Sequence, residues 1–269
     1  MTGQGTVIST APRTAARAPR AMNSWRLEWL RLIRTPRWIA LLGVYVVFGL
    51  LGPVLAKYLP DIVEHVQSDM TIVVPPPQPK DGIVNYLNQV GQTGLIVVVA
   101  IAASALAFDA RRGLSTFLRT RASSVWELVK PRVVVTAVAA VLAYTLGTLA
   151  AWYETALLLG PLPVGAVLAG LLCEGLYLVF AVAVVAAAAS VARKIVGVVG
   201  IALTALILLS VAGTLGVLHD WLPSTLAGAP VELLTTTELI DYLAAMAVTV
   251  GAVVALIAVA VVGLRRREV

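Results

Sequence analysis

The sequence predicts an all-α polytopic membrane protein with six transmembrane helices, and three observations lead to this fold class. Of the 269 residues, 59% are hydrophobic and only 13% are charged, whereas soluble domains carry about 25% charged residues. Six long stretches contain no Asp, Glu, Lys or Arg, and about 20 apolar residues span a bilayer as a helix. These stretches are continuously apolar and lack the alternation of a β-barrel strand. The single cysteine excludes a scaffold of intrachain disulfides.

The chain begins with two segments that precede the membrane domain. Residues 1–21 are rich in Thr, Ala, Gly, Pro and Arg and predict a disordered cytoplasmic tail. Residues 22–36 predict an amphipathic interface helix, because an apolar stripe at helical spacing is formed by Trp25, Trp29, Leu32 and Ile33. Arg31 and Arg34 lie away from the stripe, where they can meet lipid phosphates or an acidic partner. The helix can therefore be a simple membrane anchor, or an anchor that also contacts a cytoplasmic partner.

The membrane domain, residues 37–269, contains the six apolar stretches. We expect transmembrane helices at 38–56, 88–108, 133–152, 164–190, 195–215 and 241–264. All but two of the 20 basic residues, Lys57 and Lys80, then fall on the side that holds both termini. Cytoplasmic loops are enriched in Lys and Arg, so this side is expected to be cytoplasmic. The first span starts too late and is too long for a cleaved signal peptide, and we expect it to remain as an anchor.

The cytoplasmic loop 109–132 has the pattern of a docking element. Leu114, Phe117 and Leu118 form an apolar i, i+3, i+4 cluster, and Ser124 to Glu127 matches a capping box. The pattern predicts a short helix, a break at 120–123 and a second short helix before the third span. Apolar side chains among cations favour docking on a partner, although the same residues could lie in the bilayer interface.

The outer loops carry weaker signals. The proline run at 75–79 favours a stiff polyproline II spacer. Asp61 and His65 stand at i, i+4, but this spacing alone is a weak sign of a metal site, and a solvated interfacial helix is favoured. The segment 214–238 contains two prolines and no basic residue, and it predicts a short surface helix or a re-entrant helix.

One ionisable residue stands inside a predicted span. Glu174 lies about ten residues into the fourth predicted span, 164–190, roughly 15 Å deep at 1.5 Å per residue, and no Lys or Arg lies within any of the six predicted spans. We therefore expect a protonated carboxyl, or one hydrogen-bonded to a hydroxyl or to water, with Tyr177 as a nearby candidate. Glu174 can either join helices as a neutral group or lie on a substrate or proton path.

The sequence contains no catalytic pattern. Two histidines and one cysteine are too few for metal or Cys/His chemistry, and there is no G-x-x-x-x-G-K-[ST] phosphate-binding loop. We expect neither an enzyme nor a bound metal, and the basic loops need no nucleic acid to explain them. If the protein carries out active transport, the energy must therefore come from a partner protein or from an ion gradient.

Several segments resemble a known family. These are Trp25 to Arg31 before the first span, Asp109 to Leu114 after the second, and the stretch 119–130 with its turn, Ser, acidic residue and Lys. Together they resemble the membrane (permease) subunit of an ABC-2 type ABC transporter, in its compact six-helix bacterial form. The resemblance runs from about residue 22 to 267. It departs from the family pattern at Asp109, where Glu is common, and at Ala122, where a turn proline is common.

The resemblance implies roles for both cytoplasmic segments. The interface helix would be the segment that carries Trp25, Arg26, Trp29 and Arg31. A coupling helix within 113–130 would dock on a separate ATPase, which would hold ATP and Mg²⁺, whereas this chain would need no cofactor. The residues assigned to coupling are Arg111, Arg112, Leu114, Phe117, Leu118, Trp126 and Glu127.

The resemblance also implies an assembly in the bacterial cytoplasmic membrane. Two permease subunits, expected to be identical, would pair and be served by two ATPase subunits, with the export path along their interface and an outer gate between the fifth and sixth spans. Because few fixed charges would lie along this path, a lipophilic cargo is favoured. Two alternatives remain: a gradient-driven carrier that uses Glu174, and a non-transporting immunity or scaffold protein.

Overall fold

The structure, a computed structural model, describes residues 24–66, 76–107, 125–214, 216, 219–235 and 238–266. The predicted tail, residues 1–21, lies outside this part. Helices make up nearly all of the described chain, which contains no strand. The helices are α1 (Ser24–Arg34), α2 (Arg37–Val66), α3 (Pro79–Leu106), α5 (Val125–Leu158), α6 (Val164–Val191), α7 (Ile195–Ala212), η2 (His219–Trp221), α8 (Thr225–Glu232), η3 (Leu239–Tyr242) and α9 (Leu243–Arg266).

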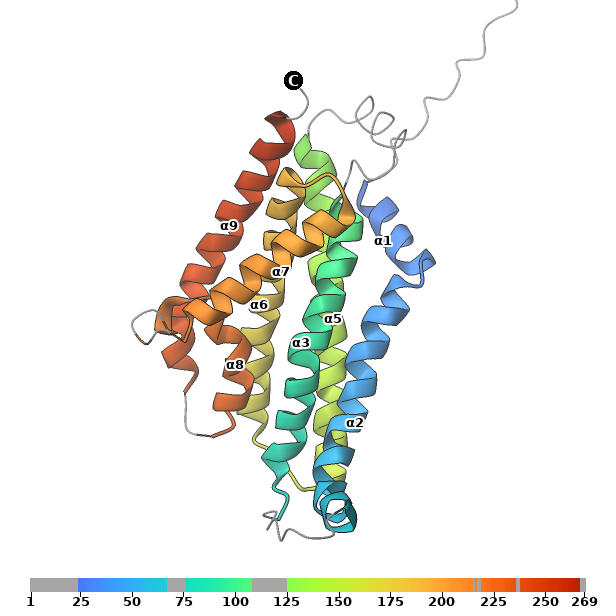
Figure 1. The fold of residues 1–269 in the computed structure, drawn as a ribbon, viewed down its shortest axis with the longest axis vertical. Helices are drawn as coiled ribbons and strands as arrows, with labels where there is room; N and C mark the ends of the chain where they lie inside the picture. The colour runs from blue at the N-terminus through green and yellow to red at the C-terminus, as the bar shows by residue number, and fades with distance from the viewer. Residues whose placement is uncertain are drawn as a thin grey trace, which may run out of the picture.

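Six of these helices are long and apolar enough to cross a membrane, as predicted. They are α2, α3, α5, α6, α7 and the helix that η3 and α9 form together. Helix α2 packs along α5 and α3, and α6 packs against α9, α8, α5, α3 and α7 (Figure 1). Helix α1 lies at one end of this bundle, against α5 and α2. The fold is therefore an all-α bundle of six candidate membrane spans, preceded by a separate short helix.

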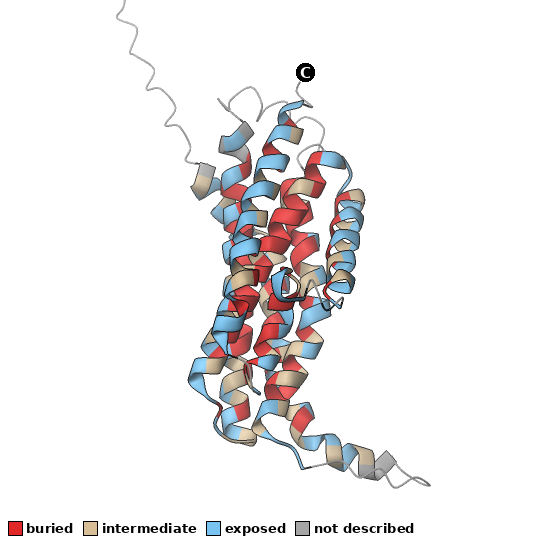
Figure 2. Cartoon of the chain, turned by 90° about the vertical axis from the view of Figure 1, so that its left-hand side faces the viewer, coloured by how far each residue is buried: buried red, intermediate tan, exposed pale blue. Residues whose placement is uncertain are grey.

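The buried residues form a column along the middle of the bundle, and exposed apolar residues cover its outer faces (Figure 2). Helix α6 is the most buried of the six spans and α7 one of the least. An apolar outer surface suits contact with lipid, because a bilayer solvates apolar side chains. The backbone polar groups then have to form their hydrogen bonds within each helix.

Glycines bring α2, α3 and α5 into close contact. A Cβ at Gly147 of α5 would lie 2.6 Å from the Tyr45 carbonyl oxygen and 2.7 Å from the Tyr86 hydroxyl. A Cβ at Gly52 of α2 would lie 2.7 Å from the backbone nitrogen of Tyr86. Only a residue without a side chain allows such approaches, and small residues are the usual means by which membrane helices pack closely.

The helix ends differ from the predicted bounds. Helix α2 continues to Val66 instead of ending at 56, and α3 begins at Pro79 instead of 88. Hydropathy marks where side chains leave the hydrocarbon layer, whereas the backbone hydrogen bonds continue into the interface. At the start of α3, the Gln78 backbone N–H donates to Asp81 Oδ2 over 2.7 Å, and Pro79 needs no N–H partner. Helix α7 ends earlier than predicted, at Ala212 instead of 215.

The predicted second short helix of loop 109–132 is not a separate element. Residues 125–132 form the first turns of α5, which continues without interruption to Leu158 and contains Pro131. The other end of the loop also differs, because α3 ends at Leu106 and not at 108. Residues 108–124, with the predicted first helix and break, lie outside the described residues.

The segment between α7 and α9 contains short helices, as predicted for 214–238. Helix α8 packs against α6, where a Cβ at Gly170 would lie 2.9 Å from the Pro230 Cα. The Ser224 hydroxyl donates to the Leu209 carbonyl over 3.2 Å and ties the start of α8 to the end of α7. The segment is thus held to the bundle on both sides.

Candidate functional site

The first candidate site is the junction of α1, α3 and α5, where a buried ion pair forms. The Arg132 Nε donates to Glu28 Oε1 over 2.7 Å, and its Nη1 donates to the Ala105 carbonyl over 3.2 Å. The side chain of Arg132 is 6% exposed and that of Glu28 is 15% exposed. Arg31, one turn further along α1, lies 3.6 Å from the other Glu28 oxygen. Glu28 therefore holds α1 against the bundle through Arg132 of α5, whereas its contact with Arg31 lies within α1.

The junction lies at both ends of the predicted docking loop. Ala105 is in the last turn of α3, just before the loop, and Arg132 is the last residue of the predicted loop 109–132 and lies in the second turn of α5. A single guanidinium group thus connects the two ends of the loop to each other and to α1.

The predicted docking residues fall mostly outside the described part of the chain. This applies to Arg111, Arg112, Leu114, Phe117 and Leu118, and to the side chain of Glu127. Trp126 is described and is 40% exposed, with the Lys130 Nζ 6.0 Å from its ring centroid. A half-exposed aromatic ring beside a cation suits either a protein partner or the bilayer interface. The docking role remains a prediction.

The predicted interface helix is present as α1, and its contacts divide the expected apolar stripe. Leu32 packs against the bundle core, whereas Trp29 and Ile33 are exposed. Trp25 is half-buried, and Arg26 is exposed. The face that contacts α5 therefore contains Glu28 as well as an apolar residue, and the exposed apolar residues are free to enter the membrane interface.

The second candidate site is a buried group of tyrosines in the centre of the bundle. Tyr45 (α2), Tyr86 (α3) and Tyr144 (α5) are almost fully buried. The Tyr45 and Tyr144 ring centroids lie 5.9 Å apart in an edge-on arrangement, and those of Tyr86 and Tyr144 lie 6.5 Å apart, nearly stacked. The Tyr86 hydroxyl lies 3.3 Å from the Thr148 hydroxyl and donates to the Tyr144 carbonyl over 3.4 Å. The Tyr144 hydroxyl has no hydrogen-bond partner among the described residues.

Glu174 of α6 extends this cluster. Its side chain is 8% exposed, and its carboxyl is close enough to the tyrosines from α2, α3 and α5 to interact with them electrostatically. Its Oε2 atom is buried and has no hydrogen-bond partner within the described part of the chain. Glu174 is therefore buried within the bundle, and this oxygen makes no hydrogen bond to Tyr177. The Tyr177 ring instead lies 6.3 Å from that of Phe180.

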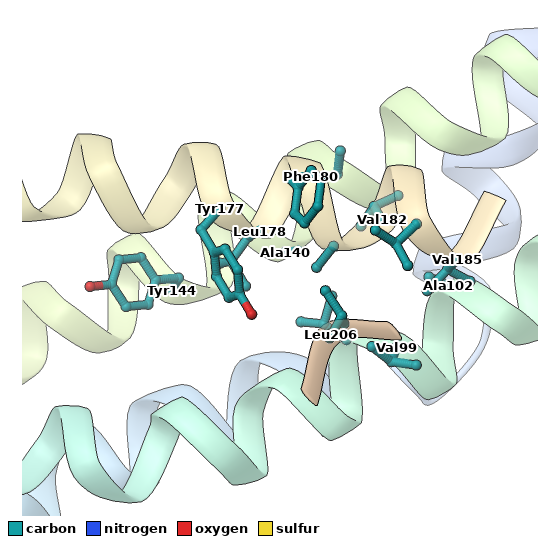
Figure 3. Close-up of a cluster of buried hydrophobic side chains, with 14 of the residues drawn as sticks. Val99, Ala102, Ala140, Tyr144, Tyr177, Leu178, Phe180, Val182, Val185 and Leu206 are labelled. Carbon is teal, nitrogen blue, oxygen red and sulfur yellow. The ribbon is translucent and has the colours of Figure 1, made fainter. Parts of the chain in front are cut away.

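A small cavity continues from the cluster towards α8. Its lining includes Tyr144 and Thr148 of α5, Gly170 of α6 and Pro230 of α8. Glu174 follows Gly170 by one helical turn and so lies on the same face of α6. Figure 3 shows the rings of Tyr144 and Tyr177 in the core, with hydroxyls that point in different directions. Tyr144 therefore lies beside a small cavity between α3, α5, α6 and α8, whereas Glu174 is not among the residues that line it.

The Asp61 and His65 spacing, a weak sign of a metal site in the first outer loop, is not supported by the described residues. No group of three or more His, Cys, Asp or Glu side chains gathers within the described ranges. Asp61 is exposed on α2, and the side chain of His65 lies outside the described residues.

Sequence reasoning did not find the partner of Glu28 or the tyrosine cluster. Glu28 and Arg132 are 104 residues apart, so no local spacing connects them. The one available signal was an acidic residue within an arginine-rich segment at the membrane boundary, which favours an ion pair. The tyrosines come from three helices and share no spacing.

Comparisons with known proteins give no assignment, because no family model, no curated protein and no solved structure matches the chain.

Proposed function

We propose that the chain is the permease subunit of an ATP-driven exporter of the ABC-2 type. Six apolar helices of spanning length support a membrane protein, and a transporter component is built from such helices. The observation that carries the finer proposal is the Glu28–Arg132–Ala105 junction, because it joins α1 to both ends of the loop that resembles a coupling element. Because the sequence contains no phosphate-binding loop, the proposal assigns ATP hydrolysis to a separate partner subunit.

The junction suggests how movement of the loop would reach the bundle. A partner ATPase that pushes on residues 109–124 would displace the end of α3 and the start of α5. Because Arg132 bonds to both Glu28 and Ala105, α1 would follow this displacement. Packed helices shift as rigid bodies and change their arrangement in discrete steps. The exported cargo is proposed to be lipophilic and to move along the interface between two copies of the chain in the cytoplasmic membrane.

Co-expression and co-purification with an ABC ATPase subunit, if one is encoded beside the gene for this chain, test the proposal, and the lack of any such neighbouring gene would count against it. The double variant Arg111→Glu, Arg112→Glu reverses charge in the proposed docking loop, and the control Arg265→Glu, Arg266→Glu makes the same change at the end of α9. We expect the loop variant to reduce ATPase recovery at least about tenfold, as loss of charge-assisted contacts predicts, and the control to keep it. Absence of an ATPase from the wild-type sample, or equal loss in both variants, would overturn the proposal.

A gradient-driven carrier is the second candidate, and the buried Glu174 Oε2, which has no hydrogen-bond partner among the described residues, favours it. Purified protein in proteoliposomes, without ATPase, should then move cargo when an ion gradient is imposed, and Glu174→Gln should abolish that movement. If Glu174→Gln leaves transport unchanged while an inactive ATPase stops it, the carrier is excluded. If cargo moves under neither condition, a scaffold or immunity role remains.

A further inference from the structure

Four exposed cations gather where α6 and α9 end, on the side of the bundle that is predicted to be cytoplasmic (Figure 1). Ser190 of α6 and Gly263 of α9 are in direct contact there, because a Cβ at Gly263 would lie 2.8 Å from the Ser190 Cβ. Helix α6 ends one residue after this contact, α9 ends three residues after it, and α7 begins just beyond the turn that follows α6. The basic residues beside the contact, which we call the α6–α9 basic patch, are Arg193, Lys194, Arg265 and Arg266. Two segments that are distant in the sequence therefore bring their positive charges to one place.

The α6–α9 basic patch has no acidic partner within the described part of the chain. No salt bridge or hydrogen bond joins any of its four side chains to another described residue. Glu28, the one carboxylate at this end of the bundle whose side chain is described, already lies 2.7 Å from Arg132. Arg267 and Glu268, which follow the patch in the sequence, add no net charge. The patch therefore attracts an anion from outside the chain.

The depth of the patch indicates which anion suits it. The spans of α6 and α9 end at Val191 and Arg266, and that of α7 begins at Ile195, so the cations stand at the level of lipid headgroups. Apolar side chains are exposed beside them, with Val191 70%, Val196 83% and Val262 49% exposed. A basic cluster directly next to membrane spans attracts anionic lipid headgroups. A phospholipid offers both a phosphate for the cations and acyl chains for the valines, whereas an acidic protein surface would satisfy only the cations.

We propose that the α6–α9 basic patch binds an anionic phospholipid through its phosphate group. The guanidinium groups of Arg193, Arg265 and Arg266 donate hydrogen bonds to the phosphate oxygens, and Lys194 contributes a point charge. The acyl chains lie along the exposed valines of the three helices. Because α7 and α9 both pack on α6, the bound lipid would connect the start of α7 with the end of α9. The proposal does not depend on the exporter function, and the predicted docking loop 109–132 takes no part in it.

Lipid binding to the purified full-length chain in neutral detergent tests the proposal, with native mass spectrometry as the measurement. The probes are phosphatidylglycerol, phosphatidylcholine and soluble glycerol 3-phosphate. Each Lys or Arg near an anionic surface changes the affinity about fivefold, and salt screens part of this effect. We therefore expect phosphatidylglycerol to bind at least about twentyfold more tightly than phosphatidylcholine. Glycerol 3-phosphate should bind far more weakly because it lacks acyl chains, and equally tight binding would show a site for free phosphate instead of lipid.

Two double variants each remove one half of the patch. Arg193→Gln, Lys194→Gln and Arg265→Gln, Arg266→Gln should each reduce the preference for phosphatidylglycerol about tenfold. Because all four side chains are exposed, these substitutions should leave the fold intact, and the melting temperature without added lipid checks this. Arg265→Lys, Arg266→Lys should keep most of the preference, because the positive charges remain.

The control separates the patch from general surface charge. Lys57→Gln, Lys80→Gln removes the same number of cations from the other end of the bundle and should keep the preference for phosphatidylglycerol. An equal loss in this control and in the patch variants would overturn the proposal. Equal binding of the two lipids by the unmodified chain would overturn it too, and would leave an acidic protein surface as the partner of the patch.

Discussion

Removing the carboxylate of Glu28 should destabilise the protein more than removing its partner Arg132. In Glu28→Gln, a guanidinium with only 6% exposure loses the carboxylate that lies 2.7 Å away. Breaking a buried pair costs 3–5 kcal/mol because a buried charge is left uncompensated, and the partial exposure of Glu28 puts the expected loss near the lower end, about 3 kcal/mol.

The opposite substitution should cost less. In Arg132→Met, Glu28 keeps Arg31 at 3.6 Å and its own side chain is 15% exposed, so we expect a loss of about 1–2 kcal/mol. The double variant should then be close to Arg132→Met alone, with a coupling energy of about 3 kcal/mol between the two positions.

Unfolding in mixed micelles of a neutral detergent and sodium dodecyl sulfate, followed by tryptophan fluorescence, measures these free energies. Arg34→Gln, an exposed change on the same helix, provides the baseline. The reasoning is refuted if Glu28→Gln costs no more than Arg34→Gln. It is also refuted if the single and double variants are additive within about 0.5 kcal/mol, because independent sites add in that way.

Three further predictions use the same assay or a simple variant of it. Gly147→Ala should lower the free energy of unfolding by about 2 kcal/mol because the new methyl would lie 2.6 Å from the Tyr45 carbonyl oxygen. In the control Gly43→Ala, no atom lies within 4 Å of the new methyl, so this substitution should be neutral or slightly stabilising. Equal effects of the two substitutions would contradict the close packing. Glu174→Gln should change the unfolding free energy by less than about 1 kcal/mol, because Oε2 gives up no hydrogen bond; a loss above 3 kcal/mol would reveal a partner. The Cys173 thiol, buried in the core, should react with a maleimide only after unfolding, and rapid labelling of the folded protein would place it at an accessible surface.

Sequence predicted the number and order of the spans because the bilayer imposes a local rule. Every backbone polar group in the hydrocarbon layer must be satisfied within its own segment, so an apolar run of sufficient length has to be a helix. The same rule does not fix helix ends. Helix α2 continues to Val66 and α3 starts at Pro79, because backbone hydrogen bonding persists in the interface after charged side chains appear.

The sites were predicted only where they depend on position along one helix. The rise per residue gave the depth of Glu174, and its inward orientation followed from the cost of exposing a carboxyl to lipid. The partner of Glu28 could not be predicted, since local spacing offered only Arg31, and the closer contact comes from Arg132 on a helix 104 residues away. Which of several arginines enters the junction depends on how α1 packs against α5, and that information is not local.

The contrast between the two sites predicts where the bundle can move. At the junction, separation of α1 from α5 breaks an ion pair of 2.7 Å between poorly hydrated groups. Between α5 and α6, the Tyr144 hydroxyl and Glu174 Oε2 make no hydrogen bonds that a shift would break. Helix α2 also packs most extensively on α5 and α3, and α6 on α9 and α8. We therefore expect α1, α2, α3 and α5 to move as one body and α6, α8 and α9 as another.

Spin-label distances measure this movement in a Cys173→Ala background. One label pair, at Ile62 of α2 and Leu157 of α5, lies within the first body, and a second pair, at Leu157 and Leu168 of α6, connects the two bodies; all three positions are exposed. When the proposed ATPase partner is trapped with nucleotide, the first distance should stay constant and the second should change. A constant second distance, or a change within the first pair, would contradict the division into two bodies. The first body is held together by the α1–α5 ion pair and by the glycine contacts of α2. It cannot deform without losing packing energy, and new contacts at its exposed outer faces would not compensate for that loss.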